Sequence, residues 1–311
     1  RRAAVERFTP FLPASPSVAA MVATGEFIGR LGRVDTAPEQ REVDGITMPF
    51  VITCAEPSAS AAAVSAWVAA NQAEIEAKLA AHGAVLFRGF PLRSAADFDA
   101  FVCSFNGWED LSYEQSMSFA VRKRVANRIC TTNEGKSGGL VYHHEQAQTP
   151  LWPSKVFFCC EKPAEPGDGG ATGLVHSALV LERLRAKHPH FVDLCEREGV
   201  RYTIFAGPEQ DPTKGAGRSW KSFFHVDTRE ECEARMARGG WEWEWGVGPR
   251  GAKLGPDFLR CVTPRLDAVK TAPGTDRKCF FNQLIATIAN ALEFSHVGKA
   301  GGGVDPLKDV P

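Results

Sequence analysis

The sequence has no long apolar run and no excess of charge of either sign. No segment offers some eighteen consecutive apolar residues, so no transmembrane helix is predicted. Lys plus Arg number 36 and Asp plus Glu number 37 among 311 residues, which gives a formal net charge of −1. That balance argues against nucleic acid or an acidic membrane surface as the main partner. We therefore expect no nucleic-acid partner and no membrane association.

Several catalytic and targeting signatures are also missing. There is no Gly-x4-Gly-Lys-Ser/Thr phosphate loop and no Gly-x-Ser-x-Gly nucleophile elbow. The nine cysteines include no Cys-x-x-Cys pair, which favours reduced thiols packed as small hydrophobic residues inside the cell. The first residues hold neither a signal-peptide apolar core nor an initiating Met. We expect a cytoplasmic or organellar protein whose start is missing or processed, with a trimmed transit peptide as one option.

The chain does hold segments with helical and strand-like patterns. Its hydrophobic content of 44% and charged content of 23% suit a protein with a real core. Apolar residues at helical spacing and a capping pattern at Ser94 predict four helices, over 59–82, from 94 onward, over 177–198 and over 229–238. Short apolar or alternating runs predict strands over 84–90, 139–145, 154–160, 199–207, 241–245, 258–264 and 277–284. We expect one mainly β domain with added helices (α+β) over residues 1–311.

The stretch VYHHEQAQTP, residues 141–150, places two histidines and a glutamate side by side in a chain with 8 histidines. On a β-strand, residues i and i+2 point to the same face. His143 and Glu145 are therefore expected to converge, while His144 points away. An imidazole and a carboxylate on one face are two of the three ligands in the 2-His-1-carboxylate arrangement that holds Fe(II). The pattern His-x-Glu alone is a weak signal, and plain structural use is the more common reason for it.

The surroundings of this stretch strengthen the metal-site hypothesis. YHHEQAQTPLWPSKVFFCCEKPAEPGDGGATGLVHS resembles the metal-binding core of the Fe(II)/2-oxoglutarate dioxygenases of the taurine dioxygenase family, in its plant-type clavaminate synthase-like branch. Further segments resemble the family in the same order. GAVLFRGFPLRSAADFDAFVCSFNGWEDLSY and TTNEG precede the site, and GRSWKSFF and KCFFNQ follow it. Together the segments span roughly residues 80–285.

The resemblance implies a double-stranded β-helix, or jelly roll, decorated by helices. It implies that His143 and Glu145 bind Fe(II) and that His144 packs or hydrogen-bonds behind the site. It also implies that the hydroxyl of Thr172, in the family's Gly-Gly-x-Thr turn, binds a carboxylate of 2-oxoglutarate. An ordinary turn hydroxyl is the alternative role for Thr172.

Three further polar residues flank segments that match the family core and are candidates for the substrate pocket: Asn133, Glu134 and Asn282. Loop capping or strand-end hydrogen bonding is the simpler role for each of them. The tryptophans of WEWEW, residues 241–245, share one strand face and are expected to pack in the core.

One part of the family pattern is missing. The resemblance implies a second metal-binding histidine and, about ten residues later, an arginine that pairs with the distal carboxylate of 2-oxoglutarate. The sequence up to GGGVDPLKDVP contains no such segment. The remaining downstream histidines are expected to be core or solvated residues: His176, His188, His190, His225 and His296. We expect a chain whose C-terminal jelly-roll strands are missing or, as the second possibility, a natural pseudoenzyme.

The activity implied by the resemblance uses a small organic substrate and O2. Hydroxylation of the substrate is coupled to conversion of 2-oxoglutarate to succinate and CO2. The presence of Glu145 argues against halogenation, because halogenating relatives replace this carboxylate with a small residue. Two alternatives stay open: a catalytically inactive jelly-roll binding protein, and a cupin-type metalloenzyme with Zn(II) or Mn(II) that is independent of 2-oxoglutarate.

Overall fold

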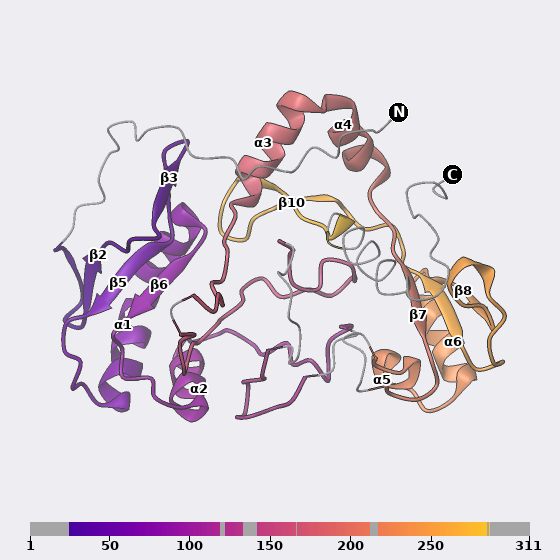
Figure 1. Cartoon of the computed structure of the whole chain (residues 1–311), viewed down its shortest axis with the longest axis horizontal. Coiled ribbons are helices and arrows are strands. Elements are labelled where there is room, and N and C mark those ends of the chain that lie inside the picture. The colour runs from indigo at the N-terminus through magenta and orange to yellow at the C-terminus, as the bar shows by residue number, and fades with distance from the viewer. Residues whose placement is uncertain are drawn as a thin grey trace. The chain divides into compact units, whose positions relative to one another are not determined.

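The structure is a computed structural model that describes residues 25–118, 122–132, 142–165, 167–211, 217–284 and 286 (Figure 1). The chain divides into two compact units. One comprises Arg1–Pro57 with Ala73–Phe90, and the other comprises Ser58–Gln72 with Pro91–Pro311. The single domain expected over residues 1–311 stays a prediction. Within the described ranges, no helix is both long enough and apolar enough to cross a bilayer.

The first unit is built on a four-stranded sheet in the order β1-β2-β5-β6. These strands are β1 (Phe27–Ile28), β2 (Gly32–Asp35), β5 (Phe50–Cys54) and β6 (Val85–Arg88). β5 and β6 are parallel, which requires a long crossover, and helix α1 (Ala61–His82) provides it. The other neighbours pair antiparallel. The helix and β6 were predicted from the sequence, whereas the strands before residue 55 were not.

A hairpin of β3 (Arg41–Val43) and β4 (Ile46–Met48) also belongs to this unit. Its two-residue loop is Asp44-Gly45, with φ angles of 51° and 77°. An Asp-Gly pair with positive φ at both positions is the turn that matches the twist of two antiparallel strands. The hairpin therefore follows from local sequence, although the helix-and-strand periodicity did not reveal it.

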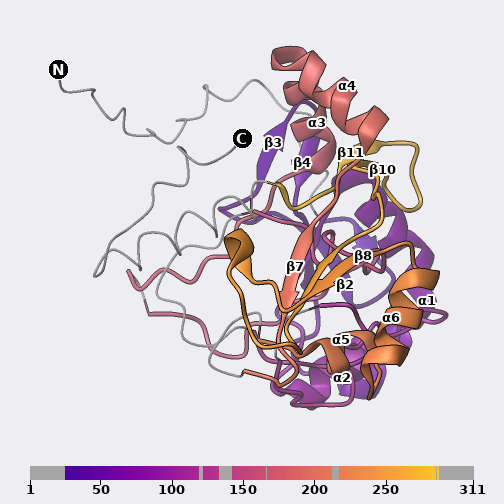
Figure 2. The same ribbon diagram turned by 90° about the vertical axis from the view of Figure 1, so that its right-hand side faces the viewer.

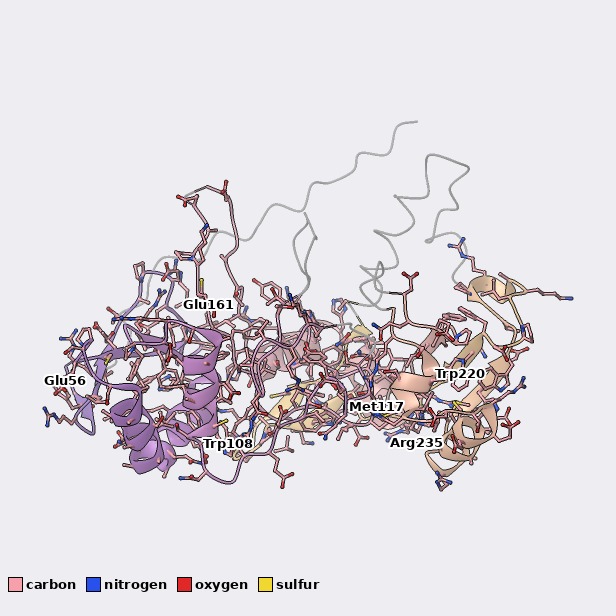
Figure 3. All side chains as sticks on the ribbon, turned by 90° about the horizontal axis from the view of Figure 1, so that it is seen from below. Glu56, Trp108, Met117, Glu161, Trp220 and Arg235 are labelled. Atoms are coloured by element: carbon pink, nitrogen blue, oxygen red, sulfur yellow. The ribbon has the colours of Figure 1, made fainter. Side chains whose placement is uncertain are left out.

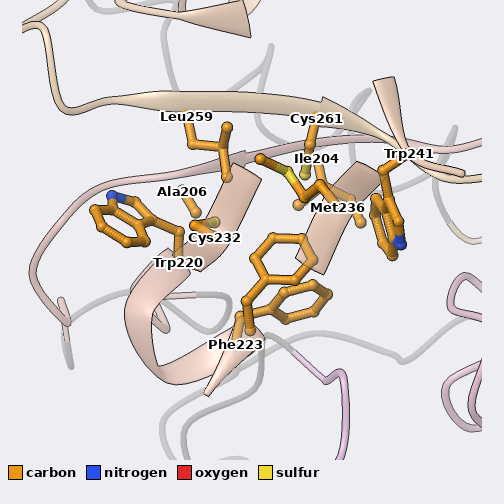
Figure 4. Packing of buried hydrophobic residues seen from close by; sticks show 10 residues of the cluster. Ile204, Ala206, Trp220, Phe223, Cys232, Met236, Trp241, Leu259 and Cys261 are labelled. Carbon is orange, nitrogen blue, oxygen red and sulfur yellow. The ribbon is translucent and has the colours of Figure 1, made fainter. Parts of the chain in front are cut away.

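The second unit contains a three-stranded antiparallel sheet in the order β7-β9-β8. Its strands are β7 (Thr203–Ala206), β8 (Glu242–Trp245) and β9 (Leu259–Val262), with a 3-10 turn, η1 (Pro249–Gly251), between the last two. Helices α5 (Trp220–Phe224) and α6 (Arg229–Arg238) cover the sheet. Phe223, Met236 and Cys261 are fully buried in the resulting core (Figure 4). The predicted strands and the helix over 229–238 are confirmed here.

A second core of this unit lies where helices α3 (Ser177–Lys187) and α4 (Pro189–Glu198) meet the hairpin of β10 (Val269–Thr271) and β11 (Lys278–Phe280) (Figure 2). The helical stretch predicted over 177–198 is confirmed, but it is divided into two helices at His188. Pro189 has no amide hydrogen and cannot continue the preceding helix, so a new helix begins there.

Helix α2 (Ala95–Cys103) begins at Ser94, whose side chain accepts a hydrogen bond from the backbone of Asp97, as the capping pattern predicted. Its buried Phe101 contacts Phe105, and the ring of Phe105 stacks on Trp108 with centroids 4.5 Å apart. Aromatic packing thus fixes the chain that leads from α2 towards residue 113.

Two predicted strands are wrong. Residues 142–144 have no regular structure and 145–148 form a turn, while 139–141 lie outside the described residues. Residues 154–158 alternate between exposed and half-buried side chains, as in a strand, residues 158–160 are all exposed, and Phe157 packs on Phe105. This segment forms no ladder with any strand of the described ranges. A strand requires a partner as well as a pattern, and periodicity reports only the pattern.

Candidate metal centre

His143 and Glu145 lie at the entrance of a turn in the second unit, with their side chains close together. Nε2 of His143 is 3.9 Å from Oε2 of Glu145, and the two side chains are 35% and 23% exposed. Two adjacent ligands of one ion, each with a bond of about 2.1 Å and at a right angle, are about 3.0 Å apart. The pair is therefore somewhat wider than this spacing and open to solvent, so a small side-chain movement would have to accompany a shared ion.

The turn, and not the predicted strand, brings the two side chains together. Gln146 has a φ of 59°, in the left-handed region. The backbone amide of Ala147 donates to the carbonyl of His144, and that of Thr149 donates to the carbonyl of Gln146. Thr149 is buried and its hydroxyl also donates to the carbonyls of Gln146 and Leu151. These bonds close the turn immediately after Glu145.

His144 points into the protein behind the pair. Its Nε2 lies 2.6 Å from the hydroxyl of Ser177, at the start of α3, and its ring contacts Phe281 with centroids 4.6 Å apart. The side-chain amide of Gln283 donates to the backbone carbonyl of His144. Burial lowers the pKa of His144, so the neutral imidazole is favoured. The expected packing role of His144 is what the structure shows.

Tyr113 holds the other side of Glu145. Its hydroxyl donates to Oε1 of Glu145 at 2.8 Å. Burial, together with the neighbouring carboxylate, raises the pKa of Tyr113, so the phenol keeps its proton and acts as the donor. The sequence analysis did not single out Tyr113, although it is the last residue of the segment GAVLFRGFPLRSAADFDAFVCSFNGWEDLSY that resembles the family.

Arg122 is a second residue that the sequence analysis missed. Its guanidinium lies over the ring of Tyr113, 5.1 Å from the centroid. Its Nε is buried and has no hydrogen-bond partner among the described residues. A buried guanidinium donor without a partner is costly. Arg122 is therefore a cation beside the site that could bind a carboxylate. The sequence gives no signal of this role, because a single arginine outside any motif has no recognisable pattern.

Thr172 follows a turn in which Gly169 and Gly170 have φ angles of 80° and 82°, a conformation that favours glycine. The residue after Thr172 fixes where this segment lies. A Cβ added to Gly173 would be 2.6 Å from the hydroxyl oxygen of Tyr142. Gly173 thus packs directly on Tyr142, the residue before His143. The role of Thr172 towards 2-oxoglutarate stays a prediction.

Of the predicted pocket residues, the structure describes Asn282, whose backbone hydrogen-bonds to the ring of His144 beside the pair. Asn282 is buried, donates to the carbonyl of Ala268 and accepts from the amide of Leu284, which is the structural role named as its simpler alternative. Asn133 and Glu134 lie outside the described residues. Their pocket role, like that of Asn282, stays a prediction.

The described residues contain no group of three or more His, Cys, Asp and Glu side chains placed to hold a metal ion. His176 precedes α3, His188 lies between α3 and α4, His190 is in α4 and His225 ends α5. His296 lies outside the described residues. Among the residues of the sequence-based metal hypothesis, the structure thus brings two side chains together, those of His143 and Glu145.

Buried polar atoms without partners support a bound group at this site. Within the described ranges four such side-chain atoms are found, and they belong to Arg122, Gln146, Gln148 and His176. Gln146 and Gln148 lie in the turn after Glu145, and Arg122 contacts the ring of Tyr113. Because native proteins rarely leave buried polar atoms unbonded, such atoms mark a place for a ligand or ordered water. Imidazole and carboxylate donors also suit Fe(II).

Comparison with known proteins identifies the family of the chain. The family described as taurine catabolism dioxygenase TauD, TfdA family, matches residues 52–291. That stretch includes Tyr113, His143, Glu145 and Thr172. The chain belongs to the TauD/TfdA family.

Two curated proteins are similar in sequence to this TauD/TfdA protein. A clavaminate synthase-like protein of Arabidopsis thaliana is 35% identical over 257 residues, which cover 80% of this chain and 73% of the relative. The dapdiamide synthesis protein DdaC of Enterobacter agglomerans is 26% identical over 212 residues, which cover 68% of this chain and 57% of that protein. The first places the chain in the clavaminate synthase-like branch of the family, as the sequence motifs indicated.

Proposed function

We propose that this TauD/TfdA protein is an Fe(II)- and 2-oxoglutarate-dependent oxygenase that hydroxylates a small organic substrate and releases succinate and CO2. The single observation that carries the proposal is the convergence of His143 Nε2 and Glu145 Oε2 to 3.9 Å. Two further observations support it: the chain belongs to a family of dioxygenases, and the neighbouring residues Gln146 and Gln148 each have a buried side-chain oxygen without a hydrogen-bond partner among the described residues. The proposed fold around the site is the family's jelly roll.

Each residue of the site has a distinct task in this proposal. His143 and Glu145 hold the metal through one nitrogen and one oxygen. Thr172 binds a carboxylate of 2-oxoglutarate through its hydroxyl, and Arg122 provides the charge that a carboxylate needs. Fe(II) with 2-oxoglutarate, when bound, supplies the oxidising chemistry that the protein itself lacks. The side chains orient these groups and keep the reaction aimed at the substrate.

The two ligand residues allow a direct test. His143→Ala and Glu145→Ala are expected to abolish succinate formation from 2-oxoglutarate in the presence of Fe(II) and O2, with thermal stability near that of the wild type. His188→Ala is the matched control, because His188 is exposed at the end of α3 and should leave succinate formation unchanged. Succinate formation that persists in both ligand variants would show that the metal is bound elsewhere or that the reaction does not depend on it.

A further inference from the structure

The loop 113–118, which carries Tyr113, is held by a single buried arginine from a distant part of the chain. Arg218 is 6% exposed and lies two residues before α5. Its Nη1 donates to the carbonyls of Tyr113, Ser116 and Ser118, at 2.8, 2.8 and 3.0 Å. Its Nη2 donates to the carbonyl of Glu114 at 2.7 Å. One guanidinium thus fixes four of the six residues of the loop.

The remaining bonds of Arg218 tie this arrangement to α5. Nε donates to the hydroxyl of Ser222, and Nη2 also donates to its carbonyl. Met117 of the loop packs on the core that contains Trp220 (Figure 3). The loop has no helix or strand of its own, so its conformation depends on these contacts. A lysine could not replace Arg218, because an ammonium lacks the planar fork that reaches carbonyls on two sides.

The loop in turn sets the position of Glu145. Tyr113 donates to Oε1 of Glu145, and His143 faces the other oxygen, Oε2. A hydrogen bond to one carboxylate oxygen restrains the rotation of the group and leaves the second oxygen directed at the metal. Outer partners of this kind orient metal ligands and tune their affinity.

We propose that Tyr113 is a positioning residue for the Glu145 carboxylate and that Arg218 keeps Tyr113 in place through the loop 113–118. This inference rests on the proposed function, since it takes Glu145 as a metal ligand. It gives the region around α5 a role beyond packing, because Ser222 of α5 and Arg218, two residues before the helix, anchor the loop that reaches the candidate metal centre.

Metal affinity of the full-length protein tests the role of Tyr113. Tyr113→Phe removes the hydroxyl and keeps the ring, and Co(II) or Mn(II) binding, measured anaerobically by calorimetry, is expected to weaken by about 10- to 100-fold. The thermal midpoint of the metal-free protein should stay close to that of the wild type. Ser104→Ala is the matched control, because it removes a hydroxyl that donates an exposed hydrogen bond to the Ala100 carbonyl at the end of α2 and should leave the affinity unchanged.

Arg218→Lys tests the anchoring step by a separate readout. Amides of residues 113–118 are expected to exchange hydrogen faster than in the wild type, while α6 keeps its protection, and metal affinity should fall as in Tyr113→Phe. Equal affinity in Tyr113→Phe, Ser104→Ala and wild type would overturn the positioning role and leave the proposed function standing. A wild-type protein that binds no metal, or binds it equally after Glu145→Ala, would overturn both.

Discussion

The hydroxyl of Tyr113 lies 2.8 Å from Oε1 of Glu145, across 32 residues of sequence. The bond leaves Oε2 of the same carboxylate facing His143. A carboxylate held at one oxygen and free at the other is suited to bind a metal through a single oxygen in a fixed direction. This relationship links the loop after α2 to the turn that carries the candidate ligands.

The direction of His144 leads to a prediction about neighbouring histidines. His144→Ala should retain metal affinity within a few-fold of the wild type, because its ring faces Ser177 and Phe281. Loss of that packing and hydrogen bond should cost about 1–3 kcal/mol in the free energy of unfolding, measured with urea. The assignment of the ligand pair is contradicted if His144→Ala loses the metal as fully as His143→Ala does.

Arg122 is expected to contribute to the binding of an anionic cosubstrate. Arg122→Gln removes the charge and should raise the Kd for 2-oxoglutarate by about 10- to 100-fold. This is the effect of losing a charged hydrogen bond of about 1.5–3 kcal/mol. Arg197→Gln, which removes an exposed arginine paired with Glu198, is the control and should bind as the wild type does. Calorimetry on the Mn(II)-loaded protein gives both values. An unchanged Kd would remove Arg122 from the site.

The contact between Gly173 and Tyr142 predicts a ligand effect without a large loss of stability. In Gly173→Ala the new methyl group would meet the hydroxyl of Tyr142 at 2.6 Å, so that exposed ring must move. We expect the Kd for 2-oxoglutarate to rise about tenfold, or about 1.4 kcal/mol in binding free energy. The reason is that Thr172 directly precedes Gly173 and His143 directly follows Tyr142. Gly255→Ala serves as control, since nothing lies within 4 Å of its added Cβ. Equal Kd values for both variants would show that the contact does not reach the ligand.

Cysteine reactivity tests the core around α6 independently of the metal. All nine cysteines are free. Burial raises the pKa of Cys232 and Cys261 to about 12, so at pH 8 these thiols stay protonated and shielded. Cys103, Cys159 and Cys160 are exposed. Iodoacetamide followed by peptide mass spectrometry should label Cys103 and Cys160 in the native protein, and Cys232 and Cys261 only after unfolding. Equal labelling of Cys232 and Cys103 in native protein would contradict the described core.

The sequence revealed most of the elements whose pattern is local. Ser94 begins a helix, and residues 229–238 form one. In the strand 242–245 the tryptophans are half-buried and the glutamates exposed, which confirms the predicted core face. The break at Pro189 and the Asp44-Gly45 hairpin were equally local but were not predicted. Residues 154–160 show the limit of periodicity, because the pattern of a strand is present without a partner.

The candidate site was partly visible in the sequence. The spacing of His143 and Glu145 and the opposite direction of His144 were predicted on the basis of a strand, and the structure reaches the same arrangement through a turn. The role of Tyr113 and the hydrogen bonds by which Arg218 holds its loop could not be found in this way. These contacts join residues 32 and about 100 positions apart, and only the folded chain brings those residues together.

The most direct test of the central claim is the visible absorption spectrum of the full-length protein with Fe(II) and 2-oxoglutarate under anaerobic conditions. A weak charge-transfer band is predicted for the wild type and for His188→Ala. The band should disappear in His143→Ala and Glu145→Ala. A flat wild-type spectrum from a folded protein, or a band that survives both substitutions, would contradict a metal centre built on His143 and Glu145.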